Sequence, residues 1–219
     1  MEKQEKKPAS GRQITYPHLF WLFIIGSVIG VIIEGVWYYF MHDHWETHVV
    51  TIWGPYCIIY GLGAAGYYAG NCAMKGKNIL LRYIVFALIG TGVELICGLV
   101  LKYGLNMRAW TYRGYPFNFM ELICLKMTLI WGFVGLIFGL LVKPIDRMFA
   151  HMQGRYWNWI CALFSVYMAV NFICTGACMV RWKQRHDGKP ASGKIAQVID
   201  EHYGDDFMQT RFVEWRFLS

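Results

Sequence analysis

Charged residues are scarce in this chain. They make up 16% of its 219 residues, whereas about 25% is usual in soluble domains. Hydrophobic residues reach 56%, above the roughly 45–50% of an average domain. This composition excludes a disordered chain and argues against a soluble globule. The formal net charge of +7 would suggest nucleic acid for a soluble chain. Here most basic residues flank apolar runs, as in membrane proteins, so we expect no nucleic-acid partner.

Several catalytic and redox motifs are also absent. No C-x-x-C pair occurs, and all seven cysteines lie within the apolar runs, which excludes a disulfide framework in the loops. The sequence has no serine nucleophile elbow and no H-E-x-x-H zinc motif. Residues 188–194 imitate a phosphate loop, but Ile195 replaces the required Ser or Thr. We therefore expect no ATP site and no cofactor, and an enzyme is the less favoured interpretation.

Five apolar runs are long enough to cross a bilayer, because a helix needs about 20 mostly apolar residues to cross ~30 Å of hydrocarbon. The runs cover residues 18–41, 52–74, 80–101, 119–142 and 158–180. We predict an all-α fold, a polytopic transmembrane helical bundle of about five spans. The bundle (18–180) would lie between an N-terminal tail (1–17) and a short soluble C-terminal tail (181–219).

Basic residues near the ends of the runs predict the orientation in the membrane. The N-terminal tail, the joint 75–78 and the loop 143–157 are basic, whereas residues 42–51 contain no Lys or Arg. Cytoplasmic loops are enriched in Lys and Arg, so we expect a multi-pass protein of the cell membrane with a cytoplasmic N-terminus. Five short helices form a narrow bundle. We therefore expect partners besides the lipid bilayer, either further copies of the chain or a separate subunit.

Glu34 and Glu94 lie inside the first and third predicted spans. A lone ionised carboxylate at that depth costs at least about 2.5–3.5 kcal/mol, so such residues normally face a bundle interior or a wet cavity. Each glutamate follows a glycine four positions earlier, Gly30 or Gly90. The glycine leaves the helix surface without a side chain one turn before the carboxylate, so that a neighbouring helix can approach there. Alternate spans run parallel, so we expect both acids at one depth. Adjacent carboxylates there would share a proton, a cation or a basic partner.

Two other groups of polar residues invite a functional interpretation. Lys126 lies inside the fourth predicted span, and Glu94 on a neighbouring helix is its candidate partner. The loop His42–His48 alternates histidines with acidic residues, and such side chains can bind a divalent metal ion. No adjacent loop supplies an obvious further ligand, so we assign no metal site.

The start of the second predicted span carries a recognisable motif. Residues 53–63 read Trp-Gly-Pro-Tyr-Cys-Ile-Ile-Tyr-Gly-Leu-Gly and resemble the G-P-x-C-P-I-Y-G-x-G signature of the CmpB-type (type IV) bacterial ABC-transporter permeases. Further matching pieces occur in the family's order: Glu34, Glu94-x-x-x-Gly98, Trp110-Thr111-Tyr112, Phe117-Asn118, Ile123-Cys124-Leu125, Trp131-Gly132 and Pro144. The resemblance covers residues 19–144. It departs at Ile58, which replaces the central proline, and at Arg113, which ends a W-T-Y-R in place of the family's W-D-Y-S.

The resemblance implies an integral membrane protein assigned to transport, and no transported substrate follows from it. The same residues fit a lined cavity, since Gly54 and Pro55 give an irregular helix start with free backbone groups. The other motif residues with an expected role are Tyr60, Gly61 and Gly63 in the signature, and Trp110, Tyr112, Tyr115 and Asn118 as a cap over the glutamate-bearing end.

Three functional hypotheses remain open. The first is a permease-like protein, an ABC-type transporter subunit whose ATPase is a separate polypeptide, with Glu34 and Glu94 lining a polar path. The second is a membrane enzyme acting on a lipid, with one glutamate as general acid or base. The third is a non-catalytic assembly or sensor subunit in which both acids only fix helix packing.

Overall fold

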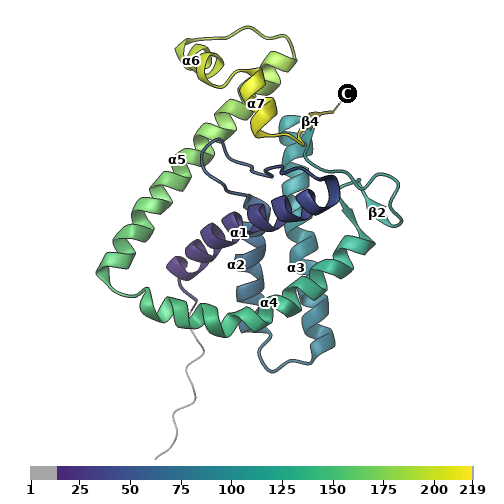
Figure 1. Cartoon of the computed structure of the whole chain (residues 1–219), viewed down its shortest axis with the longest axis vertical. Helices are drawn as coiled ribbons and strands as arrows, with labels where there is room; N and C mark the ends of the chain where they lie inside the picture. The colour runs from purple at the N-terminus through teal and green to yellow at the C-terminus, as the bar shows by residue number, and fades with distance from the viewer. Residues whose placement is uncertain (1–13, 219) are drawn as a thin grey trace, which may run out of the picture.

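The computed structural model describes residues 14–218 of the chain as a set of helices with short strand pairs at one end (Figure 1). Most of the predicted N-terminal tail, residues 1–13, lies outside the described residues. In chain order the elements are α1 (Tyr16–His42), α2 (Ile58–Ala73), α3 (Ile79–Leu99), the π-helix η1 (Val100–Leu105), β1 (Met107–Arg108), β2 (Asn118–Phe119), β3 (Ile123–Cys124), α4 (Leu125–His151), α5 (Arg155–His186), α6 (Lys194–His202), α7 (Asp205–Arg211) and β4 (Arg216–Phe217).

Four of the described helices are long and apolar enough to cross a membrane. They are α1, α3 continued by η1 as far as Leu105, α4 and α5. α2 has 16 residues, about 24 Å at 1.5 Å per residue, which is shorter than the ~30 Å of a bilayer core. The all-α membrane fold is confirmed. Among residues 14–218 it has four helices long enough to cross a bilayer, together with the shorter α2, where about five spans were predicted.

α2 begins at Ile58, later than the predicted span, because the Gly54-Pro55 pair prevents an earlier start. Gly54 has φ +72°, and Cys57 at the N-cap is extended with φ −118° and ψ 113°. Proline has no N–H and also disfavours the helical conformation in the residue before it. Residues 52–57 therefore form a loop at the end of the bundle.

α4 also begins later than predicted, at Leu125, because β2 and β3 pair as an antiparallel hairpin over residues 118–124. Met120 and Glu121 in its turn have φ 56° and 64°, a left-handed conformation that a right-handed helix cannot include. At its other end α4 continues through Pro144 to His151. A proline inside a helix removes a hydrogen bond and bends it, and α4 changes direction along its length (Figure 1).

The bundle is built on two helix pairs, α1 with α2 and α3 with α4, which α2 joins by packing against α3 and α4. Glycines permit these close approaches. A Cβ at Gly30 would overlap the ring of Tyr60, and one at Gly90 would overlap Trp131. A Cβ at Gly61 would lie 2.3 Å from Ser27 Oγ and one at Gly98 would lie 2.9 Å from Leu122 Cδ2, whereas a Cβ at Gly63 would meet no atom within 4 Å.

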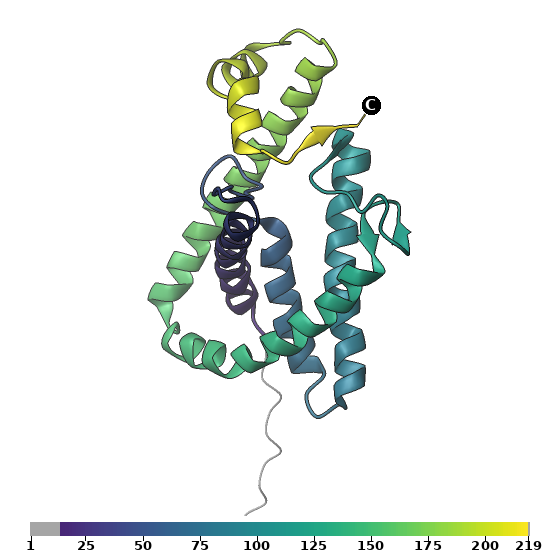
Figure 2. The same cartoon turned by 45° about the vertical axis from the view of Figure 1, so that its right-hand side comes forward.

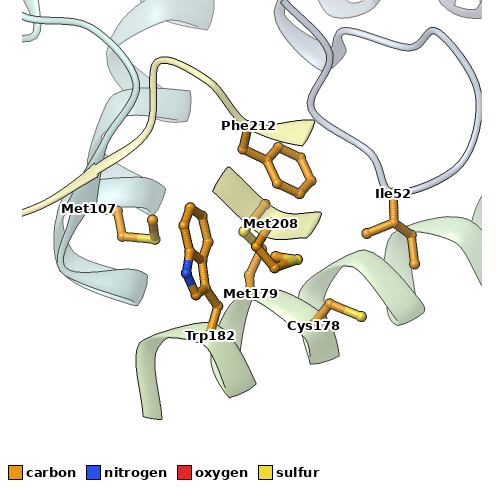
Figure 3. Packing of buried hydrophobic residues seen from close by; sticks show 7 residues of the cluster. All are labelled: Ile52, Met107, Cys178, Met179, Trp182, Met208 and Phe212. Carbon is orange, nitrogen blue, oxygen red and sulfur yellow. The ribbon is translucent and has the colours of Figure 1, made fainter. Parts of the chain in front are cut away.

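The C-terminal segment folds back onto the ends of the spans. Met208 of α7 and Phe212, the residue that follows α7, pack in one buried cluster with Met179 and Trp182 of α5 (Figure 3). Ile52 from the α1–α2 loop belongs to the same cluster. β4 then pairs antiparallel with β1, with Met107 opposite Phe217. The tail therefore runs from the end of α5 to the end of α3 (Figure 2).

Ion pairs strengthen this docking. The buried guanidinium of Arg181 donates to both oxygens of Asp200, at 2.9 and 2.7 Å. Arg185 pairs with Asp200 and, at 2.6 Å, with Asp205. The pKa of Asp200 is lowered to about 2, chiefly by the hydrogen bond from Arg181. The predicted soluble tail is thus packed against α5 and against the loops at one end of the bundle.

Candidate functional site

A cavity of about 450 Å³ lies at the end of the bundle that the tail covers. α1, α2, α3 and α4 all contribute to its walls, together with the loops 47–50 and 109–112 and the tail residues 212–215. Its walls are mostly apolar. The titratable side chains on them are Glu34, His48, Cys57, Tyr60, Glu94, Cys97, Tyr112 and Glu214.

Glu34 reaches the cavity from α1 and is only partly buried. Gly30 lies one turn before it, and the absence of a side chain there lets the ring of Tyr60 pack directly on α1. The Tyr60 hydroxyl interacts with the Glu34 carboxylate. The glycine that the sequence singled out therefore makes room for a partner of the acid.

Glu94 reaches the same cavity from α3, and only 5% of the residue is exposed. Its carboxylate accepts hydrogen bonds from the Tyr112 hydroxyl and, at 3.0 Å, from Trp131 Nε1. Gly90, one turn earlier, allows the Trp131 side chain to approach α3. Two neutral donors, one on each carboxylate oxygen, thus satisfy this buried acid.

The two glutamates share a cavity but not their partners. The groups that act on Glu34 are His48, Glu214 and Tyr60, whereas Glu94 is held by Tyr112 and Trp131. Neither acid is among the other's partners within the described residues. Their contacts therefore give no support to the predicted sharing of a proton or a cation between Glu34 and Glu94. The carboxylate that lies within 4.8 Å of Glu34 is that of Glu214, which the sequence analysis did not connect with it.

Of the four residues predicted to cap the glutamate-bearing end, Trp110 and Tyr112 line the cavity, and Tyr115 and Asn118 do not. Trp110 lines the cavity and fixes the hairpin by donating from Nε1 to the Leu122 carbonyl at 2.9 Å. Burial raises the pKa of Tyr112 and the bond to Glu94 raises it further, so its hydroxyl stays protonated and donates. Asn118 is exposed in the hairpin and bonds to the Tyr115 carbonyl at 2.8 Å. It does not line the cavity.

Lys126 lies away from the position expected for it. The side chain is exposed at the start of α4, and its Nζ lies 5.7 Å from the centre of the Tyr115 ring. Within residues 14–218 it makes no ion pair with Glu94. α4 starts later than predicted, so Lys126 is in its first turn, at the end of the span, where the charge reaches water.

Glu214 is the functional candidate that the sequence analysis missed, and His48 was considered only as part of the loop 42–48, to which no metal site was assigned. His48 Nε2 lies 3.0 Å from Glu214 Oε1. Burial alone would lower the pKa of His48, but the hydrogen bond to Glu214 and the charges of Glu34, Glu214 and Glu46 raise it. The histidine-rich loop was the available signal. Its partners come from α1 and from a tail residue 166 positions later, which no local pattern reveals.

Comparison with known proteins supports the motif-based assignment. The family model described as "Putative ABC-transporter type IV" matches residues 21–176, more than two thirds of the chain. The match extends beyond residue 144 and includes most of α5, which the motifs had left outside the resemblance. No curated protein and no solved structure matches the chain. The predicted family is confirmed: the chain is a membrane protein that belongs to the CmpB-type, type IV ABC-transporter family.

Proposed function

We propose that the chain is a permease-like subunit of a transporter and that Glu34 and Glu94 line its polar path. The observation that carries the proposal is the single cavity whose walls include both carboxylates, one from each of two candidate membrane spans. Acids inside membrane spans are normally functional because their burial is costly. The family membership supports the same class of function.

The two acids have different roles in this proposal. Glu94 is held in one position by two hydrogen-bond donors. Its role in this proposal is to provide a fixed polar group in the wall of the path along which the substrate moves. Glu34 is less buried and interacts with titratable neighbours, so it is the group able to exchange a proton or a cation as the substrate moves. The tail residues 212–215 cover this end of the cavity, and substrate passage requires their movement.

The energy source must come from another protein if the transporter is of the ABC type. The sequence has no phosphate loop with the required Ser or Thr after its lysine. We propose a separate ATPase subunit, bound where the spans reach the cytoplasm, and a homo-oligomer is the alternative assembly. An ATP-hydrolysing protein that copurifies in mild detergent is the expected partner.

The test compares transport by the unchanged protein with transport by E34Q and E94Q. Inverted membrane vesicles from cells that express each protein are supplied with ATP and a cell extract, and retained compounds are identified by mass spectrometry. We expect at least one compound to be retained or expelled by the unchanged protein only. The variant E201Q, on the exposed face of α6, is the matched control.

The unchanged protein and its variants must be present in the vesicles in equal amounts, so that a difference in transport does not reflect a difference in abundance. Identical compound profiles for E34Q, E94Q and the unchanged protein would contradict the proposal. A loss of abundance and thermal stability together with function would indicate that the acids fix packing. Conversion of a labelled lipid by the unchanged protein alone would favour a membrane enzyme.

A further inference from the structure

Three potential metal ligands meet at the tail-covered end of the cavity. Glu34 comes from α1, His48 from the α1–α2 loop and Glu214 from the segment between α7 and β4. One ligand atom from each residue lies within 4.8 Å of the other two. An imidazole and a carboxylate from neighbouring segments thus meet a carboxylate from the tail, 166 residues after His48, which is the pattern of a binding site completed by the tertiary fold.

The hydrogen bonds within this cluster do not satisfy its polar groups. The His48 side chain is only 5% exposed, and its Nε2 faces Glu214. Its Nδ1 is buried and has no hydrogen-bond partner within the described part of the chain. An unpaired buried nitrogen is costly, and neither Glu214 nor a metal ion on Nε2 would pair it, so it is the convergence of the three ligand atoms and their charge that point to an ion.

The charges of the three side chains favour a cation between them. Two carboxylates that approach each other in a partly desolvated site repel. Even a protonated histidine between them would leave one uncompensated negative charge. A divalent cation with a neutral imidazole and two carboxylates gives a neutral site, which is the balance that a low-dielectric surrounding favours.

The donor set and its spacing select the kind of ion. One nitrogen and two oxygens suit a borderline divalent transition metal, and three protein ligands with an open position are usual for zinc sites that bind water or substrate. Zinc bonds to nitrogen and oxygen are about 2.0–2.2 Å long, so two ligands of one tetrahedral ion lie roughly 3.4 Å apart. The ligand atoms here lie within 4.8 Å of one another, so the side chains must close by up to about 1.4 Å to bind the ion.

We propose that Glu34, His48 and Glu214 bind one divalent transition-metal ion, with Zn²⁺ the best match, and that its open coordination position faces the cavity. Because Glu214 belongs to the tail, the ion joins the tail to α1 and closes this end of the cavity. The site stands on its own geometry and does not depend on the transport proposal.

The test measures metal binding to the full-length protein in detergent. Metal is removed with a chelator, and the protein is then equilibrated with ZnCl₂ or, separately, with MgCl₂. Bound metal is counted by mass spectrometry of the elements. We expect one Zn²⁺ per chain and no retained Mg²⁺. Replacement by Co²⁺ should give visible absorption bands typical of mixed nitrogen and oxygen ligation.

Matched variants separate the site from its surroundings. H48Q and E214Q should each weaken Zn²⁺ binding at least ~100-fold, because removal of a group that only orients a metal ligand already costs about 10–100-fold. H44Q, in the same loop but with a side chain 61% exposed, and E201Q should keep the affinity of the unchanged protein. E214Q keeps the test decisive if H48Q does not fold, since the Glu214 side chain is 42% exposed.

The proposal is overturned if the unchanged protein binds no Zn²⁺, or if H48Q and E214Q bind it as tightly as H44Q and E201Q. Failure of transport is distinguishable, because metal binding is read on purified protein. If the protein binds Zn²⁺ but transports nothing, the permease proposal is refuted and the metal-site proposal stands. If E94Q loses transport but binds Zn²⁺ normally, the result supports both the permease proposal and the metal-site proposal.

Discussion

Glu94 shows how a single residue can be buried without a charged partner. Its carboxylate receives one neutral donor on each oxygen, from Tyr112 and Trp131. Hydrogen bonds to a charged group contribute roughly 1.5–3 kcal/mol, more than bonds between neutral groups. The expected ion pair with Lys126 is therefore unnecessary, and Tyr112 from the loop before the hairpin and Trp131 from α4 take its place.

The variant Y112F tests this arrangement. Removal of the hydroxyl leaves one oxygen of a buried carboxylate without a donor, so we expect the protein to lose about 1–3 kcal/mol of stability. The measurement is thermal unfolding in detergent, followed by circular dichroism.

Tyr115 provides the control for this substitution. It lies beside Tyr112, with ring centroids 5.8 Å apart, and is 43% exposed. Y115F should unfold at the same temperature as the unchanged protein. Equal effects of Y112F and Y115F would refute the role assigned to the bond with Glu94.

At the scale of helices, small residues set how closely α1 and α2 approach. The signature at residues 53–63 supplies Tyr60 and Gly61, and both positions are used at this interface. Tyr60 packs on Gly30 of α1, while Gly61 lies against Ser27 and Phe23. The packing glycines of one helix thus face the bulky side chains of the other, which holds Tyr60 beside Glu34.

The pair G30A and G63A tests the helix interface. An added methyl group at Gly30 overlaps the Tyr60 ring, and overpacking of this kind typically costs about 1–3 kcal/mol. At Gly63 there is open space, and alanine is favoured over glycine in a helix interior by about 1 kcal/mol. We expect G30A to lower the unfolding temperature and G63A to leave it unchanged or raise it.

The abundance of each protein in membranes provides a second readout. G30A should reduce it and G63A should not. If both substitutions were tolerated equally, α1 and α2 would not be packed as closely as the structure has them.

At the scale of the whole molecule, the tail connects the ends of α5 and α3 and supplies Glu214 to the cavity. Its docking depends on the buried guanidinium of Arg181 and on Asp200. Because the pKa of Asp200 is about 2, below the ordinary value near 3.9, the ionised form stabilises the folded state. This contribution is complete above about pH 4 and is lost as the pH falls toward 2.

The variant D200N should therefore release the tail even at neutral pH. Arg181 would keep its buried position but lose its charged partner. We expect trypsin to cleave the segment 183–194 several-fold faster than in the unchanged protein, as measured by electrophoresis and mass spectrometry. In the unchanged protein, resistance to cleavage should not vary between pH 5 and pH 8. E201Q, next along the chain, should be as resistant as the unchanged protein.

Local patterns in the sequence predicted the class of fold and part of the site. Runs of about 20 apolar residues identify membrane helices wherever they occur. The cost of a carboxylate in such a run marked Glu34 and Glu94, and both line the cavity. The Gly54-Pro55 pair predicted an irregular helix start, and the backbone at Gly54 has a positive φ of 72°, which glycine adopts without steric cost.

The tertiary structure alone decided which groups surround each acid. His48 and Glu214 are 166 residues apart, and they meet only because α7 docks on α5 and carries the chain back over the cavity. The hairpin at 118–124 delays the start of α4 to Leu125 and places Lys126 at the end of the span. Hydrophobic length and the cost of burial are properties of a segment, so the sequence determined them. The partners of a buried polar group depend on which distant segments fold together, and only the packed molecule determines that.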